Sequence, residues 1–115
     1  MKVLVCGDRN YTDYHKIYTY LEDLPEKGTI IIEGGARGVD SLAKRAAEDL
    51  GLLVIEYKAH WKLYGKAAGP KRNRLMLQEN PDVVFAFHSD LSKSKGTKHM
   101  VSIARKAGIK VRLFS

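Results

Sequence analysis

Cysteine is almost absent from this sequence, and its scarcity excludes two kinds of site. Cys6 is the only cysteine among 115 residues, so the chain has neither an intrachain disulfide nor a zinc site built on several thiolates. We interpret Cys6 as a buried structural thiol. The four histidines lack the i, i+4 pairing and the acidic neighbours of a metal site. We therefore expect no metal, no cofactor and a reducing, cytoplasmic environment.

Long apolar runs are also missing. The opening apolar stretch ends at Gly7, too soon for the core of a signal peptide or for a membrane span, so we expect no membrane partner. With 44% apolar and 29% charged residues, the composition is typical of a globular protein that folds alone or as a homo-oligomer. A chain of 115 residues has room for one domain, which we expect to span residues 1–115.

Acidic residues are scarce in the second half of the chain. Residues 57–115 hold thirteen Lys and Arg against three acids, whereas residues 1–56 hold seven against ten. The net charge of +7 therefore belongs to the second half. Such an imbalance raises the local electrostatic potential and favours anionic partners, which include nucleotides, nucleic acids and acidic proteins. Charge alone does not distinguish among them.

Apolar runs alternate with helical patterns along the chain. Five short apolar or β-branched runs predict strands at 2–6, 29–32, 52–55, 82–87 and 109–114. Helical periodicity predicts helices near 14–24, 39–50, 71–79 and 97–107, and leaves 58–69 as the least regular segment. This alternation favours parallel strands joined by right-handed crossovers. We predict an α/β fold: a doubly wound three-layer sandwich with a mainly parallel sheet of about five strands.

Residues 33–40, Glu-Gly-Gly-Ala-Arg-Gly-Val-Asp, stand where a strand turns into a helix. Glycines let the backbone approach an anion closely, and a helix start offers free N–H groups and a partial positive charge. Arg37 adds a guanidinium that can clamp a phosphate. These features favour an anion site over a plain tight turn in which Arg37 is solvated and Asp40 supports Lys44.

Two familiar phosphate motifs are missing. Gly7 is not part of a Gly-x-Gly-x-x-Gly run, and the chain contains neither Gly-Lys-Ser nor Gly-Lys-Thr. The absence argues against an ordinary NAD dehydrogenase and against a P-loop hydrolase.

Two segments of the basic half combine cations with an expected helix start. Pro70 suits the first turn of a helix, which would display Arg72 and Asn73. Nearby, Trp61 and Tyr64 either stack on a base or, as such pairs do more often, form a satellite core.

The second of these segments is Ser89–Thr97, which also precedes an expected helix. Gly96 and Thr97 either close over a phosphate or belong to a mobile surface loop, and these residues alone favour neither reading.

Four separated motifs together resemble the SLOG superfamily, specifically its YspA/YpsA-related (YAcAr-like) branch. They are residues 5–9, 34–40, 68–73 and 96–97, each at a transition between a strand and a loop. The resemblance covers nearly the whole chain. It implies a Rossmann-like nucleotide-binding fold, whose members are proposed to sense or process nucleotides, ADP-ribose or NAD derivatives, often in phage and bacterial conflict or stress systems.

The LOG phosphoribohydrolases of the same superfamily are similar around Pro-Gly-Gly-x-Gly-Thr-x-x-Glu, whose glutamate assists cleavage of a base-to-ribose bond. Here only Gly96 and Thr97 remain, and Met100 occupies the glutamate position. A thioether neither activates water nor stabilises an oxocarbenium-like centre, so such an enzyme would need Glu33 or Asp8 as a substitute carboxylate. DprA, another SLOG member, binds single-stranded DNA, which leaves nucleic acid open as a partner.

We therefore expect a module that senses or sequesters a nucleotide or nucleotide-derived small molecule. The alternatives are a hydrolase of N-glycosidic or phosphate bonds, with Glu33 and Asp8 as catalytic residues, and a single-stranded nucleic-acid binder. Phosphates are expected over residues 34–38 and near residues 96–97, with Asn73, Asp8 or Asp40 on ribose or base edges. The expected ligand-binding residues are Gly7, Asp8, Arg9, Gly34, Gly35, Ala36, Arg37, Gly38, Asp40, Arg72, Asn73, Gly96 and Thr97.

Overall fold

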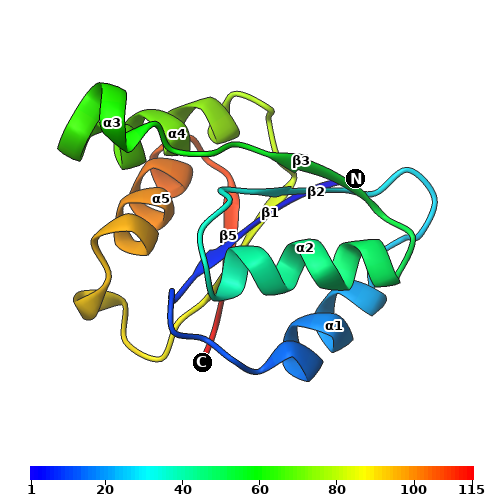
Figure 1. The fold of residues 1–115 in the computed structure, drawn as a ribbon. Helices are drawn as coiled ribbons and strands as arrows, with labels where there is room; N and C mark the ends of the chain where they lie inside the picture. Colours follow the sequence, from blue (N-terminus) through cyan, green and yellow to red (C-terminus); the bar gives the residue numbers. More distant parts are fainter.

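Five parallel strands form one sheet at the centre of the molecule (Figure 1). The computed structural model describes all residues, 1–115. The strands are β1 (Lys2–Gly7), β2 (Ile30–Glu33), β3 (Leu53–Glu56), β4 (Val83–Phe87) and β5 (Lys110–Phe114). They lie in the order β3-β2-β1-β4-β5, and every neighbouring pair is parallel. The predicted Rossmann-like α/β sheet of about five strands is confirmed.

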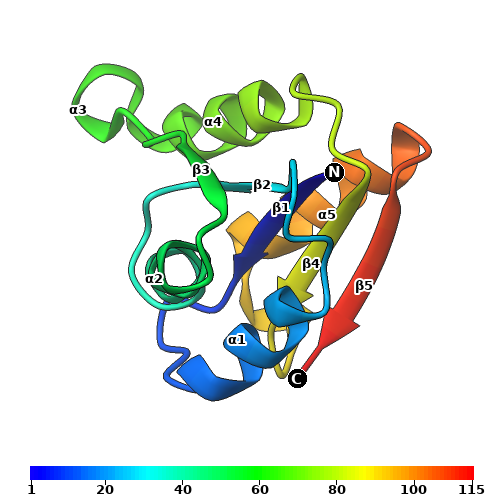
Figure 2. The ribbon, with the colours of Figure 1, turned by 90° about the vertical axis from the view of Figure 1, so that its right-hand side faces the viewer.

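Helices cover both faces of this sheet (Figure 2). They are α1 (Tyr14–Glu22), α2 (Val39–Asp49), α3 (Trp61–Tyr64), α4 (Ala68–Leu77) and α5 (Lys95–Lys106). Helices α1 and α2 pack on one face and on each other, while α4 and α5 pack on the other face. None of these helices is long and apolar enough to cross a membrane.

Two local predictions need correction. Residues 58–69, expected to be irregular, contain α3, a 3-10 turn at Gly65–Ala67 and the start of α4, because the Trp61 ring packs against Gly69 and holds this segment to α4. Helix α5 begins at Lys95 rather than at residue 97, because the Ser94 hydroxyl caps it by accepting the N–H of Thr97 at 3.2 Å.

The core consists of two apolar layers separated by the sheet. Side chains alternate along β1, so Val3 and Val5 face α1 and α2, whereas Leu4 and Cys6 face α4 and α5. All four are buried, as is typical of a central parallel strand. Burial also raises the pKa of the Cys6 thiol far above its usual range. Cys6 is thus the buried thiol that the sequence predicts.

The winding direction of the chain reverses between β1 and β4. From β1 the chain proceeds outward to β2 and β3, and it then returns to place β4 on the other side of β1 and β5 beyond β4. The connections of the two halves therefore lie on opposite faces, and the loops that follow β1 and β4 diverge. In open parallel sheets a crevice forms at this point, beyond the carboxyl ends of the strands.

Gly38 allows the loop after β2 to contact the loop after β1. Its φ is +74°, and a Cβ at this position would overlap the Asp8 carbonyl oxygen and the Arg9 backbone. The close approach brings the N–H of Val39 within 3.1 Å of the same Asp8 oxygen. Both the backbone conformation and the lack of space require glycine here.

Replacing Gly38 by Ala should therefore destabilise the fold strongly. Gly51 offers a matched control, because its φ is also +74° but a Cβ there would meet no atom within 4 Å. We expect Gly51→Ala to cost about 1–2 kcal/mol from the left-handed conformation alone. Gly38→Ala should cost a further amount of about 1–3 kcal/mol from the steric overlap. Urea unfolding of both variants measures the difference, and equal losses would contradict this explanation.

Candidate functional site

A cleft of about 620 Å³ lies beyond the carboxyl ends of β1 and β4. It is lined by the loop after β1, by part of the loop between β2 and α2, and by the first turns of α4 and α5. Nine of the expected ligand-binding residues line it: Gly7, Asp8, Arg9, Ala36, Asp40, Arg72, Asn73, Gly96 and Thr97. The other four, Gly34, Gly35, Arg37 and Gly38, do not. The structure thus brings together residues from all four sequence motifs.

The glycine loop, residues 34–38 between β2 and α2, already binds an anion, which is the Asp40 side chain of the protein itself. Oδ2 of Asp40, which is 7% exposed, accepts hydrogen bonds from the N–H groups of Gly34 and Ala36, each at 3.2 Å. The N–H of Gly35 donates to Glu33 Oε1 at 2.6 Å. These three amides are therefore committed within the chain. The expected phosphate position over residues 34–38 thus has three of its five amides already bonded, and the exposed Arg37 side chain lies outside the cleft lining.

Arg72 connects α4 to the same loop. Its Nη1 donates to the Gly34 carbonyl oxygen at 2.6 Å, and its Nε donates to Asn73 Oδ1 at 3.0 Å. A Cβ on Gly34 would overlap the Arg72 guanidinium, so this contact requires glycine. Asn73 in turn donates from Nδ2 to the Gly96 carbonyl oxygen at 3.2 Å and lies 3.1 Å from His99 Nδ1. This network joins the loop after β2 to the start of α5.

Burial shifts the pKa values of two charged side chains that line the cleft, Asp40 and Arg72. It raises the pKa of Asp40 to about 6, and the Ala36 N–H and the Arg72 guanidinium partly offset this effect. Burial also lowers the pKa of Arg72, which the Asp40 carboxylate counteracts. At neutral pH Asp40 is ionised and Arg72, as an arginine, keeps its charge, so the two charges largely compensate each other beneath the cleft.

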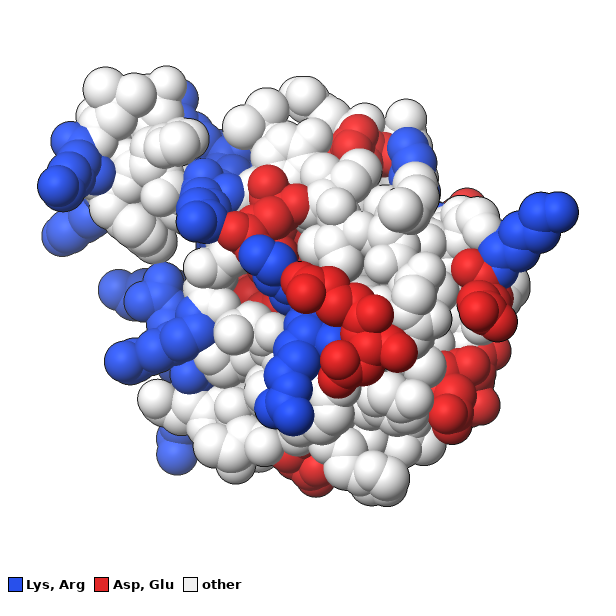
Figure 3. Space-filling model, turned by 45° about the vertical axis from the view of Figure 1, so that its right-hand side comes forward, with Lys and Arg blue, Asp and Glu red and all other residues white.

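Four exposed cations line the cleft without an acidic partner: Arg9, Lys66, Lys93 and Lys95. The only ion pairs of the chain, Lys44–Glu56 and Lys58–Glu56, lie outside it. Figure 3 shows this separation of charge, with most Lys and Arg on the left side of the view and most acids at the centre and right. The cleft is therefore open to an anion.

The start of α5 adds backbone donors to these cations. Ser94 satisfies the N–H groups of Thr97 and Lys98, which leaves the first amides of the helix, those of Lys95 and Gly96, without an acceptor inside the helix. A Cβ at Gly96 would meet no atom within 4 Å, so packing does not require glycine there. A helix of twelve residues presents a partial positive charge at this end.

Glu33 does not line the cleft. It follows Ile31 by two residues on β2, so its side chain shares the α2 face of the sheet, next to Glu56 in register on β3. Glu56 itself pairs with Lys44 of α2 at 3.3 Å. The catalytic role expected for Glu33 must be corrected, because strand alternation turns it away from the cleft. The other expected catalytic residue, Asp8, does line the cleft and accepts the N–H of Asn10 at 2.8 Å.

Burial and, to a smaller extent, a hydrogen bond with Glu56 together raise the pKa of Glu33 to about 8. The side chain is fully buried, and Oε2 has no donor to bond when the group is ionised. The same hydrogen bond lowers the pKa of Glu56. Glu33 is therefore held in its protonated form around neutral pH.

Several cleft residues were not among those expected from the sequence. They include Asn10, Lys66, Lys93, Lys95 and His99, whereas Trp61, which also lines the cleft, is one of the two aromatic residues that the sequence offers for base stacking. A usable signal existed for Lys93 and Lys95, because they flank Ser94, and a serine three residues before Thr97 is a common helix start. His99 could not be anticipated, since its place depends on its contact with Asn73.

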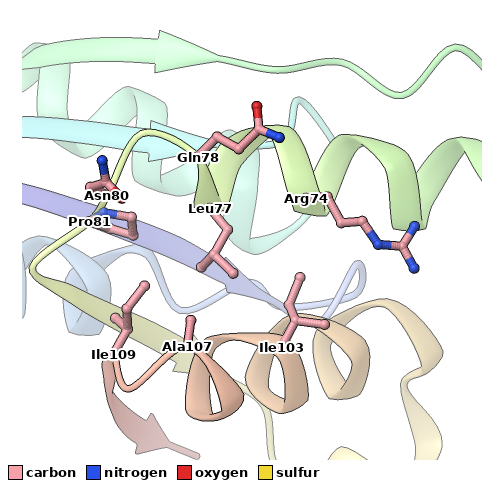
Figure 4. Close-up of a pocket in the computed structure, with 8 residues that line it drawn as sticks. All are labelled: Arg74, Leu77, Gln78, Asn80, Pro81, Ile103, Ala107 and Ile109. Carbon is pink, nitrogen blue, oxygen red and sulfur yellow. The ribbon is translucent and has the colours of Figure 1, made fainter.

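A second hollow, of about 480 Å³, lies at the opposite edge of the sheet, near the amino ends of β4 and β5. Figure 4 shows Leu77 of α4 facing Ile103 and Ala107 of α5 across it. It contains one cation, Arg74, and none of the expected site residues. Its apolar lining offers no convergent polar groups, so the cleft at β1 and β4 is the candidate site.

A family model matches residues 1–64, more than half of the chain. The chain belongs to the YspA, cpYpsA-related SLOG family. The resemblance predicted from the motifs is thus confirmed. The matched part of this SLOG protein contains the loops after β1 and β2, whereas Arg72, Asn73 and α5 lie beyond it.

Over 118 aligned residues, this SLOG protein is 36% identical to the gene 61 protein of Mycobacterium phage D29, with 96% of this chain and 93% of the relative covered. Its fold is similar to that of DNA processing protein A (DprA) from Streptococcus pneumoniae, with a TM-score of 0.58 and 20% identity. That match covers 96% of this chain and 58% of the DprA chain. At such identity the likeness concerns the fold alone.

The protonated state of Glu33 predicts a pH-dependent stability. The pKa of Glu33 rises from its ordinary value of 4.5 in the unfolded chain to about 8 in the folded protein. Unfolding therefore releases a proton in this interval, and the free energy of unfolding falls as pH rises from about 4.5 to about 8. The Glu33→Gln variant has no carboxyl group to ionise at this position. Above pH 8 it should therefore be more stable than the wild type by about 1–3 kcal/mol. The advantage should disappear near pH 4.5.

Urea unfolding across this pH range is the measurement, with the exposed Glu48→Gln on α2 as the control. A Glu33→Gln effect that does not change with pH would contradict the pKa assignment.

Removing the Asp40 carboxylate should destabilise the loop that it holds. Asp40→Ala leaves the N–H groups of Gly34 and Ala36 without their acceptor and should cost about 1.5–3 kcal/mol at neutral pH. Glu48→Ala, an exposed change on the same helix, should cost less than about 0.5 kcal/mol. Chemical denaturation compares the two variants. Similar losses would mean that the loop does not depend on Asp40.

Proposed function

We propose that this SLOG protein, as one binding domain of residues 1–115, binds a nucleotide or nucleotide derivative in the cleft at β1 and β4. The observation that carries the proposal is the convergence of four unpaired cations and the first turn of α5 on one cleft. The volume of about 620 Å³ lies within the usual range for small-molecule sites. We propose that the bound ligand is sensed or sequestered rather than transformed.

The phosphate groups are proposed to lie at the start of α5. Lys93 and Lys95 flank that start, and the amides of Lys95 and Gly96 point out of the helix end. The alternative position over the glycine loop is less suitable, because Asp40 and Glu33 accept three of its N–H groups and Ala36 alone of residues 34–38 lines the cleft. The helix start is therefore the better anion site.

Asp8 is the best group for a ribose hydroxyl. It is partly exposed in the cleft, and only one of its oxygens, Oδ1, accepts a hydrogen bond within the chain. Asn73 is 3% exposed and uses both its amide nitrogen and its oxygen on protein partners. Asp40 is similarly committed to the glycine loop. These two residues support the walls of the cleft instead.

Single-stranded nucleic acid is a second candidate ligand. Exposed lysines continue beyond the cleft at Lys62 of α3 and at Lys98 and Lys106 of α5. Figure 3 shows Lys and Arg gathered on one side of the molecule. Such a surface favours a polyanion as well as a mononucleotide. A hydrolase remains an alternative only with Asp8 as its carboxylate, since Glu33 lies outside the cleft lining.

Gly96→Asp tests the proposed phosphate position. An acidic residue in the first turn favours the helix, so the variant should fold at least as stably as wild type. The same carboxylate repels a phosphate, so affinity for nucleotides should fall at least about tenfold, which corresponds to about 1.4 kcal/mol. Isothermal titration calorimetry with AMP, ADP, ADP-ribose and NAD is the measurement.

Ser102→Asp is the matched control, because it adds the same charge at an exposed position of α5 outside the cleft lining. It should bind nucleotides as wild type does. Equal losses in both variants would indicate a general charge effect and reject the α5 site. Affinity that instead grows with oligonucleotide length and falls steeply with salt would favour the nucleic-acid alternative. Product formation from the nucleotide panel would favour the hydrolase.

A further inference from the structure

Trp61 is the one Trp, Tyr or Phe side chain that lines the cleft. Among the other lining residues the apolar ones are Cys6, Ala36, Pro70 and Met76, and none of these has an aromatic ring. Trp61 is 48% exposed, and α3 buries none of its residues. The indole therefore packs against the edge of α4 without entering a core, so packing accounts for only part of its surface.

The position of the indole is fixed by α4. A Cβ on Gly69 would lie 3.2 Å from Cη2 of Trp61, so the outer edge of the ring packs closely against a buried glycine. Any larger residue at this position would push the ring away. The edge of the indole is thus held against the start of α4.

The exposed face of the indole is directed into the cleft. The guanidinium of Arg9 lies over the ring, with Cζ 5.7 Å from the ring centroid, and Arg9 itself lines the cleft. A base that stacks on this face would therefore replace the Arg9 guanidinium or stack beside it. Cations and planar bases both stack favourably on an indole, because its face is electron-rich and its surface is apolar.

We propose that Trp61 recognises the nucleobase by stacking, and that the site consequently selects base-bearing nucleotides, purines before pyrimidines, over base-free phosphosugars. This inference rests on the proposed nucleotide-binding function. The cations near the start of α5 attract any phosphate ester and do not distinguish one that carries a base from one that lacks it. Only the indole offers a flat apolar surface, and a bicyclic purine overlaps a bicyclic indole over a larger area than a single ring does.

The sequence provides a direct probe of this contact, because Trp61 is the only tryptophan in the chain. A base stacked on the indole changes its fluorescence, whereas a ligand bound elsewhere does not touch it. We expect AMP and ADP to quench the emission of the wild-type protein in a saturable manner. Ribose 5-phosphate and pyrophosphate should leave it unchanged, and UMP should bind more weakly than AMP.

Substitutions at Trp61 distinguish a loss of stacking from a general change in the shape of the cleft. Trp61→Leu keeps an apolar side chain but removes the ring, and should weaken AMP binding by about 5- to 150-fold, the range that stacking on one base contributes. Trp61→Tyr keeps an aromatic face and should retain most of the affinity. Tyr64→Leu is the matched control on the same helix, since Tyr64 is 45% exposed and does not line the cleft. Calorimetry should show unchanged ribose 5-phosphate binding in all three variants.

The outcomes distinguish this inference from the function on which it rests. If calorimetry shows AMP binding to wild type but Trp61→Leu binds AMP equally well, or AMP leaves the fluorescence unchanged, stacking is refuted and nucleotide binding stands. If ribose 5-phosphate binds as tightly as AMP, the base is not recognised. If no nucleotide binds to wild type, both proposals fail. The fluorescence titration uses the wild-type protein and remains decisive even if a variant does not fold.

Discussion

The contact between the Asp40 carboxylate and the amides of the glycine loop is the interaction on which the rest of the site depends. It fixes the backbone after β2, and Arg72 then bonds to the Gly34 carbonyl oxygen of that fixed segment. Through Asn73 the same network reaches the Gly96 carbonyl oxygen at the start of α5. A buried charge held by backbone N–H groups thus sets the positions of both walls of the cleft.

Packing within the chain explains two of the three glycines in the glycine loop. Gly34 makes room for the guanidinium, and Gly38 makes room for the loop after β1. Both are therefore explained by packing. The exposed cations and the helix start, in contrast, have no partner within the chain. Some residues of the site therefore maintain its shape, whereas others have charges or N–H groups available for a ligand.

Sequence patterns predicted the fold well, because buried parallel strands are continuous apolar runs and the helices show clear periodicity. They also predicted that the four motifs meet, since all follow strand ends in a parallel sheet. They were wrong about Glu33, although its spacing from Ile31 indicates the opposite face of the strand. They could not reveal that Asp40 occupies the glycine loop, or that Arg72 and Gly34 touch across 38 positions, because these contacts depend on three-dimensional packing.

The strand order also constrains how the molecule is made. β1 is the middle strand, yet one of its two neighbours, β4, is completed only at Phe87. A nascent chain that has emerged as far as β3 has one edge of its central strand unpaired and has no Arg72 to bond to Gly34. Pairing between segments so distant in sequence is slow, since a long loop must close first. The cleft at β1 and β4 is accordingly among the last parts of the protein to form during synthesis.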